Sequence, residues 1–188
     1  MRRAVPNLVQ RMLEGDSASF HDILDLYSGD VLRLCCALLW DDEEAKDVLQ
    51  EAMFRLVRSV KRGRFRESDG SIKGFLMITA RNLCVDRLKK RVDLRSLEED
   101  ESSTPTALCE THTPDRAADE NRLRLVFDHA LGELTDAQRA VLVLRDLKGE
   151  NHRDIAEALH ISVDSAKALL YRARRKMRFL LKPYMDQS

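Results

Sequence analysis

The chain has 188 residues, with 32 basic and 32 acidic side chains, 5% aromatic residues, seven glycines and four prolines. This length allows one good core or two small ones, and the scarcity of aromatic residues, glycine and proline favours helices over sheets. No apolar run approaches the roughly 18 residues of a membrane span, and the N-terminus lacks the continuous apolar stretch of a secretory signal, so we expect a cytoplasmic protein without membrane insertion.

The first part of the chain predicts four helices. Apolar residues at helical spacing mark a short helix before Gly15 and a longer helix over residues 20–34. A third helix begins at Asp41, a typical N-cap, and continues to about Lys61. A fourth helix runs over residues 72–91. Four helices of this kind form a compact bundle.

One face of the third helix is polar but carries an aromatic side chain. Asp47, Gln50, Glu51 and Phe54 share this face at spacings of three and four residues. A monomer gains nothing from a phenylalanine in a polar stripe. Two interpretations stay open on this pattern alone, a solvated face with one stray aromatic and a surface that binds a partner.

Charge is sorted along the chain although the formal net charge is zero. Residues 93–120 carry nine acidic and two basic side chains, whereas residues 81–91 carry five basic side chains and residues 160–182 carry seven, with one acidic side chain each. A charged partner that responds to the local electrostatic potential therefore meets two basic helices, one on each side of an acidic middle.

The acidic middle predicts a flexible linker. Residues 92–116 are rich in serine, threonine and proline, contain few apolar side chains and show no helical period. We therefore expect an all-α protein of two small helical domains, residues 1–91 and 117–188, joined by this acidic linker.

The second domain predicts a helix-turn-helix. A helix to about Leu131 is followed by shorter helices that Thr135, Asn151 and Ser162 cap at their starts. Ala156 stands where two helices approach closely, and a three-residue turn begins at His160.

The last helix offers an outward face that suits the major groove of DNA. Arginine holds guanine bidentately, and further basic side chains neutralise phosphates. A solvated basic face is the alternative. The candidates for contact with base edges or for flanking contact are Ser165, Lys167, Ala168, Tyr171 and Arg172, and those for phosphates are Arg174, Arg175, Lys176 and Arg178.

The four cysteines do not predict a metal site. Cys35, Cys36 and Cys84 fall in apolar helical stretches, where a thiol behaves as a small hydrophobe. Cys109 and His112 offer two ligands, but a structural or catalytic metal site needs a third or fourth. We expect no metal and no cofactor, and a role of these residues in redox or metal sensing stays open.

Three motifs in order resemble the extracytoplasmic-function sigma factors, the two-domain bacterial initiation factors of the sigma-70 family. They are DDEEAKDVLQEAMFRLV at 41–57, GFLMITARNLCVDRLKKR at 74–91 and LTDAQRAVLVLRDLKGENHRDIAEALHIS at 134–162. Together they span nearly the whole chain, and three such motifs around a linker are far more specific than any one of them.

The resemblance implies a monomer that binds core RNA polymerase and promoter DNA and that an anti-sigma factor controls. It implies that the polar face with Phe54 docks on the coiled coil of the largest polymerase subunit. The last helix would read the minus-35 element as duplex, and the linker would thread through the polymerase cleft. The residues that it implies for melting and capturing the minus-10 strand are Arg64, Phe65, Ser71, Lys73, Arg81 and Asn82.

The chain departs from the family pattern at three positions. Phe75 replaces the usual tryptophan at a packing position, and His160 replaces the glycine of the turn, where it must adopt a conformation that glycine adopts more easily. Leu169 stands where an arginine is common, on a side that the sequence predicts to face outward. The promoter sequence is therefore expected to differ from the usual one.

Two other classes of protein compete with this interpretation. A conventional helix-turn-helix regulator binds duplex without a partner, usually as a dimer on a palindrome, and does not need the face with Phe54. An enzyme would need a catalytic constellation or a phosphate-binding glycine loop, and the sequence offers neither. We therefore predict that the chain is not an enzyme.

Overall fold

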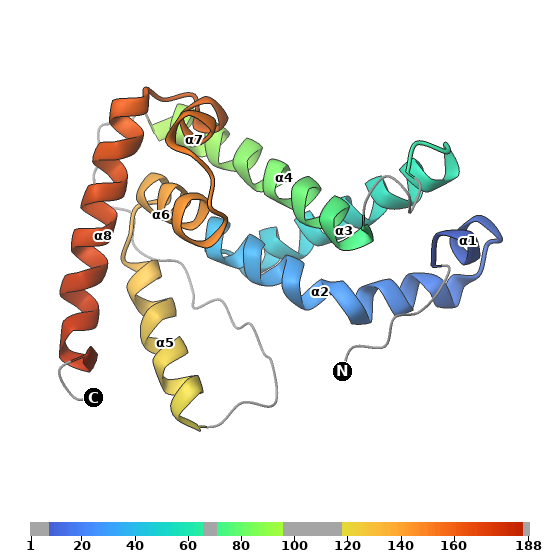
Figure 1. Ribbon diagram of the computed structural model, residues 1–188, viewed down its shortest axis with the longest axis horizontal. Coiled ribbons are helices and arrows are strands. Elements are labelled where there is room, and N and C mark those ends of the chain that lie inside the picture. The colour runs from blue at the N-terminus through green and yellow to red at the C-terminus, as the bar shows by residue number, and fades with distance from the viewer. Residues whose placement is uncertain (1–7, 66–70, 96–117, 186–188) are drawn as a thin grey trace.

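The computed structural model describes residues 8–65, 71–95 and 118–185. Every regular element in these ranges is a helix, as the sequence predicts, and none of them is long and apolar enough to cross a bilayer. Figure 1 shows their arrangement. In chain order they are α1 (Leu8–Leu13), α2 (Ser17–Leu39), α3 (Asp42–Lys61), α4 (Ile72–Arg95), α5 (Ala118–Gly132), α6 (Asp136–Leu142), the π-helical segment η2 (Val143–Leu147), α7 (His152–Leu159) and α8 (Val163–Met185).

The N-terminal half, from α1 to α4, is the predicted four-helix bundle. α2, α3 and α4 pack pairwise on one another, and α1 lies against α2 and α3. Side chains fix the starts of two helices, because the carboxylates of Asp16 and Asp41 each accept a backbone N–H at 2.9 Å. Such caps satisfy donors that the first helical turn leaves unpaired. The predicted start of the third helix at Asp41 is confirmed.

The C-terminal half, from α5 to α8, contains the predicted caps. Thr135 and Gln138 form a reciprocal capping box at the start of α6, and Asn151 accepts the backbone N–H of Asp154 at 2.9 Å at the start of α7. The helix that Thr135 caps is α6 followed directly by η2. The backbone N–H of Lys148 donates to the carbonyl of Val143, and this wider turn ends the helical path.

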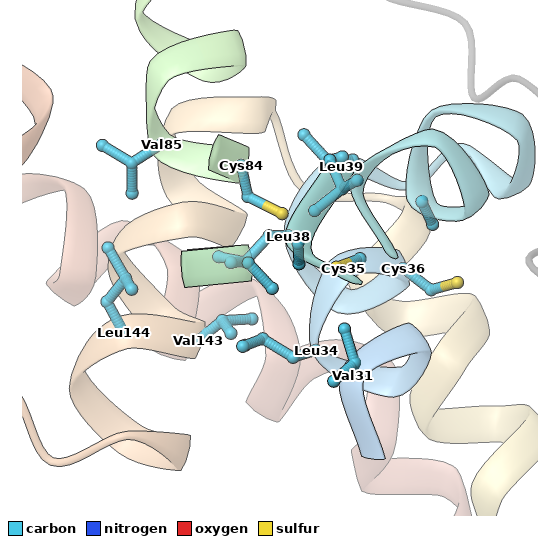
Figure 2. Close-up of a cluster of buried hydrophobic side chains, with 14 of the residues drawn as sticks. Val31, Leu34, Cys35, Cys36, Leu38, Leu39, Cys84, Val85, Val143 and Leu144 are labelled. Carbon is cyan, nitrogen blue, oxygen red and sulfur yellow. The ribbon is translucent and has the colours of Figure 1, made fainter. Parts of the chain in front are cut away.

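The buried side chains of the two halves form one continuous hydrophobic cluster. Figure 2 shows Leu34 and Leu38 of α2 and Cys84 of α4 beside Val143 and Leu144 from the C-terminal half. α6 packs on both α2 and α4, and α7 contacts α4. The two small helical domains that the sequence predicts are present, and their buried side chains join in one cluster among the described residues.

Candidate functional site

The polar face of α3 is exposed as the sequence predicts. Asp47 and Gln50 lie in solvent, and the side chain of Phe54 is 68% exposed. Glu51 is half-buried and accepts from the Nε of Arg55 at 2.7 Å. The opposite face supplies the core of the bundle, so α3 is held rigidly while it presents this stripe. Most of the ring surface of Phe54 is therefore open to a partner.

The loop before α4 uses its aromatic side chain for packing. Phe65 is only 7% exposed, and its ring meets that of Phe75 edge to face with 5.3 Å between centroids. The neighbouring ring therefore covers Phe65 in this conformation, so its expected part in capturing the minus-10 strand would require it to leave Phe75. Phe75 packs against the core, as its position in the motif predicts.

The other candidates near α4 divide into exposed and paired side chains. Arg64 is exposed, and Ser71 caps α4 by accepting the backbone N–H of Gly74 at 3.0 Å. Lys73 lies 2.5 Å from a carboxylate oxygen of Asp30. Residues 66–70 of this predicted loop lie outside the described part of the chain.

Arg81 is bound to a residue that the sequence did not indicate. Its Nε donates to Glu150 at 2.9 Å and its Nη2 to the second carboxylate oxygen at 2.5 Å, while Nη1 donates to the exposed Asn82 at 3.1 Å. Glu150 lies 69 residues away, in the loop before α7. No local pattern links two residues so distant, so only the fold reveals this pair.

The turn of the helix-turn-helix has the predicted geometry. His160 adopts a left-handed conformation with φ of 55°, and Ser162 caps α8 by accepting the backbone N–H of Ser165 at 3.0 Å. Ala156 is 3% exposed at the corner. A left-handed non-glycine residue costs free energy, and the packed corner holds it in place.

α8 separates a buried stripe from an exposed one. Ala166, Leu170, Ala173 and Met177 are buried. All nine candidates predicted for contact with the minus-35 element are exposed, namely Ser165, Lys167, Ala168, Tyr171, Arg172, Arg174, Arg175, Lys176 and Arg178. The helix therefore presents a polar, mostly basic surface of the kind that enters a major groove.

Four of these basic side chains already hold acceptors within the C-terminal half. Within α8, Lys167 donates to Asp164 at 3.2 Å and the Nε of Arg172 donates to the carbonyl of Ala168 at 3.4 Å. Arg174 and Lys176 hold acceptors outside α8. Arg174 donates to the carboxylate of Asp146 from Nε at 3.0 Å and from Nη2 at 2.5 Å. These hydrogen bonds raise the pKa of Arg174. Lys176 donates to the carbonyl oxygen of Glu133. Both lie on the flanks of α8, whereas Arg172 and Arg175 lie on its outward side.

Leu169 is half-buried and packs at the edge of the core. The sequence placed it on the outward side of α8 between Ser165 and Arg172. The observed packing corrects this, since a side chain partly held by the core has less surface to offer a thymine methyl group.

Cys35 and Cys84 are buried free thiols, as predicted for small hydrophobes, whereas Cys36 is buried but disulfide-bonded, which the sequence did not predict. A hydrogen bond with Cys35, together with burial, raises the pKa of the Cys84 thiol well above its usual range. Among the described residues no group of three or more His, Cys, Asp or Glu side chains is arranged to hold a metal ion. Cys109 and His112 lie outside the described residues.

Two family models match the two halves. The model described as Sigma-70 region 2 matches residues 23–93, and the model described as Sigma-70, region 4 matches residues 124–177. The two matches keep the order that the motifs predicted, and neither extends across the acidic middle.

Curated relatives match along nearly the full chain. The RNA polymerase sigma-H factor of Pseudomonas aeruginosa is 27% identical over 96% of this chain and 95% of its own. The ECF RNA polymerase sigma factor SigW of Bacillus subtilis is 24% identical over 95% and 97%. The solved structure of the sigma factor RpoE from Bartonella quintana with the anti-sigma factor NepR has a TM-score of 0.49 and 20% identity, over 87% of this chain and 96% of that one.

Proposed function

We propose which residues contact core polymerase and which contact promoter DNA, because the chain belongs to the extracytoplasmic-function group of the sigma-70 family. It is an alternative sigma factor, which binds core RNA polymerase and directs transcription initiation at particular promoters. The family consists of initiation factors, and we propose that the chain works in the cytoplasm, as a monomer and without catalytic activity of its own.

We propose that residues 1–91 bind core polymerase and melt the minus-10 element, that residues 117–188 read the minus-35 element, and that residues 92–116 link the two. The docking surface on polymerase is the exposed face of α3, with Asp47, Gln50, Glu51 and Phe54. The observation that carries this assignment is Phe54, whose side chain is 68% exposed on a helix that the core holds rigid.

Five exposed or half-buried residues in the loop before α4 and in its first half are proposed for the minus-10 strand. Extruding a base costs a few kcal/mol, and charged and polar side chains recover part of that through contacts to the strand. Phe65 is left out of this set because it packs against Phe75. The set consists of Arg64, Ser71, Lys73, Arg81 and Asn82.

The outward side of α8 is proposed to read the minus-35 element. Arg172 and Ala168 face away from the buried stripe and lie where a helix in the groove meets base edges. Arg175 is the strongest candidate for a phosphate contact, because Arg174 and Lys176 are held by acceptors in the protein. We also propose control by an anti-sigma factor, as the family membership implies.

Transcription with purified components tests the proposed function. The chain and a bacterial core polymerase are incubated with sheared genomic DNA, and the DNA held by the complex is sequenced. We expect a shared two-part sequence upstream of transcription starts, obtained only when both proteins are present. Tight binding of the chain alone to a two-fold symmetric site would instead identify a conventional helix-turn-helix regulator.

A further inference from the structure

A small cavity lies between α2, the start of α4 and η2. Its volume is about 310 Å³, which falls at the lower end of the range of roughly 300–1,000 Å³ found for small-molecule sites. Four residues of α2, from Asp30 to Ala37, line the cavity at spacings of three and four, because such residues share one face of a helix. A volume of this size suits a small organic molecule.

One wall of the cavity is basic. Arg33, Lys73 and Lys148 form this wall, and Asp30 is the one acidic residue that lines the cavity with them. Arg33 donates from Nη2 to one carboxylate oxygen of Asp30, and the Nζ of Lys73 lies 2.5 Å from the other. The side chain of Asp30 is 13% exposed. Three positive charges against one negative charge leave the basic wall with a surplus of two.

Lys148 has no acceptor for its ammonium group among the described residues. Its backbone N–H donates to the carbonyl of Val143, which fixes the start of the side chain at the end of η2. Glu150 acts on it only from a distance, because Arg81 holds both oxygens of that carboxylate. Partial burial of the ammonium group and then the positive charge of Lys73 lower the pKa of Lys148. An anion between the two lysines would offset this repulsion.

The floor of the cavity is apolar. Leu34, Met77 and Val143 form this floor, and Figure 2 shows Leu34 beside Val143. Leu147 stands at the rim and is 57% exposed. It belongs to the π-helical segment η2, a kind of turn that is rare and frequent at functional sites. An exposed leucine next to an apolar floor gains free energy when a ligand covers it.

We propose that this cavity binds a small phosphomonoester, with the phosphate group at the basic wall and an aliphatic carbon chain on the apolar floor. A phosphomonoester carries nearly two negative charges near neutral pH, which balances the surplus of the wall. A phosphodiester of a nucleic-acid strand carries one charge and offers the floor no aliphatic chain. The residues that line the cavity include no aromatic ring to stack on a nucleobase.

This site is separate from the proposed promoter contacts. Of the basic wall, only Lys73 also belongs to the residues proposed for the minus-10 strand, and Arg33 and Lys148 belong to none of the proposed surfaces. The inference therefore stands or falls independently of the proposed function.

Binding to the full-length chain is measured by calorimetry and mapped by nuclear magnetic resonance at pH 8, where the phosphate groups are dianionic. The main probe is n-butyl phosphate, which joins a dianionic group to an aliphatic chain. Inorganic phosphate lacks the chain, and pentanoate keeps the chain but carries a single charge. We expect saturable binding of butyl phosphate, with the largest amide shifts at Leu147 and Lys148. The other two probes should bind at least about tenfold more weakly.

Two pairs of variants test the wall and the floor separately. Lys148→Gln should weaken the binding of butyl phosphate about tenfold, because it removes a charged hydrogen-bond donor, whereas Lys61→Gln at the end of α3 should leave it unchanged. Leu147→Ala should weaken the binding of butyl phosphate but not of inorganic phosphate, and Leu125→Ala on α5 should change neither. All four side chains are exposed, so each variant should keep its helical content by circular dichroism.

Four results would overturn the proposal. The first is a lack of saturable binding of butyl phosphate. Equal weakening by Lys148→Gln and Lys61→Gln would show a general attraction of anions instead of a site. Inorganic phosphate that binds as tightly as butyl phosphate would remove the apolar floor from the site. Single-stranded DNA that binds in a Lys148-dependent way, while butyl phosphate does not bind, would identify a strand contact in place of a phosphomonoester site.

Discussion

Replacing Phe54 by alanine tests the docking face of α3. The side chain is 68% exposed, and a phenylalanine buries about 150–250 Å² when it is fully covered. Roughly two-thirds of that area is therefore available to a partner. At about 25 cal/mol per Å², its burial contributes at most about 3–4 kcal/mol. Because alanine retains part of this area, Phe54→Ala should weaken binding to core polymerase by about 2–3 kcal/mol, or about 30- to 150-fold in Kd.

The assay is fluorescence anisotropy of the labelled full-length chain titrated with core polymerase. Leu125→Ala is the matched control, since Leu125 is 65% exposed but lies on α5, outside the proposed surface. It should leave the Kd nearly unchanged. Both variants should unfold within about 0.5 kcal/mol of the wild type, because exposed side chains contribute little to folding.

Two results would refute the reasoning about Phe54. Equal effects of Phe54→Ala and Leu125→Ala on the Kd would show that exposed apolar area in general, and not this face, governs the binding. A parallel loss of binding to minus-35 duplex by the full chain would show that the substitution disturbs the fold, and the α3 face would lose its assignment.

Two further substitutions and one labelling experiment probe other parts of the molecule. Arg172→Ala should reduce discrimination for the minus-35 element by about 1–3 kcal/mol in a competition assay, and an equal loss on all sequences would make Arg172 a phosphate contact. Thr135→Ala removes one half of the capping box of α6 and should lower the free energy of unfolding by about 1 kcal/mol in a urea titration, whereas no change would mean that the cap contributes nothing. Cys84, whose thiol pKa is raised by its hydrogen bond with Cys35 and by burial, should react with iodoacetamide at pH 8 far more slowly in the native than in the unfolded protein. Residue-resolved mass spectrometry measures both rates, and similar values would contradict a closed core around this thiol.

Features that depend on near neighbours in sequence could be predicted. The caps at Asp41, Thr135, Asn151 and Ser162 each use a side chain and a backbone N–H within three residues, and the structure contains all four. The exposed stripe of α3 follows from helical spacing in the same way. Local chemistry therefore predicted the helix starts and the surfaces that the helices present.

Features that depend on the meeting of distant segments could not be predicted. The burial of Phe65 requires Phe75 across a loop, and the pairing of Arg81 requires Glu150 from the other half. Helical spacing predicted that Leu169 faces outward, but its burial depends on which side chains of the core reach α8, and these come from distant segments. The contact between the two halves has no signature in the sequence, since its apolar residues look like ordinary core residues of two separate domains.

The internal partners of Arg174 and Lys176 have a consequence for the ionic-strength dependence of promoter binding. Each phosphate that a protein cation neutralises releases condensed counterions, which adds about 0.9 to the slope of log K against log salt. A side chain that keeps a carboxylate or carbonyl as its partner releases none. For Arg174 and Lys176, whose partners lie outside α8, the slope measured with the minus-35 duplex should therefore be shallower by nearly two than the count of basic residues on α8 implies.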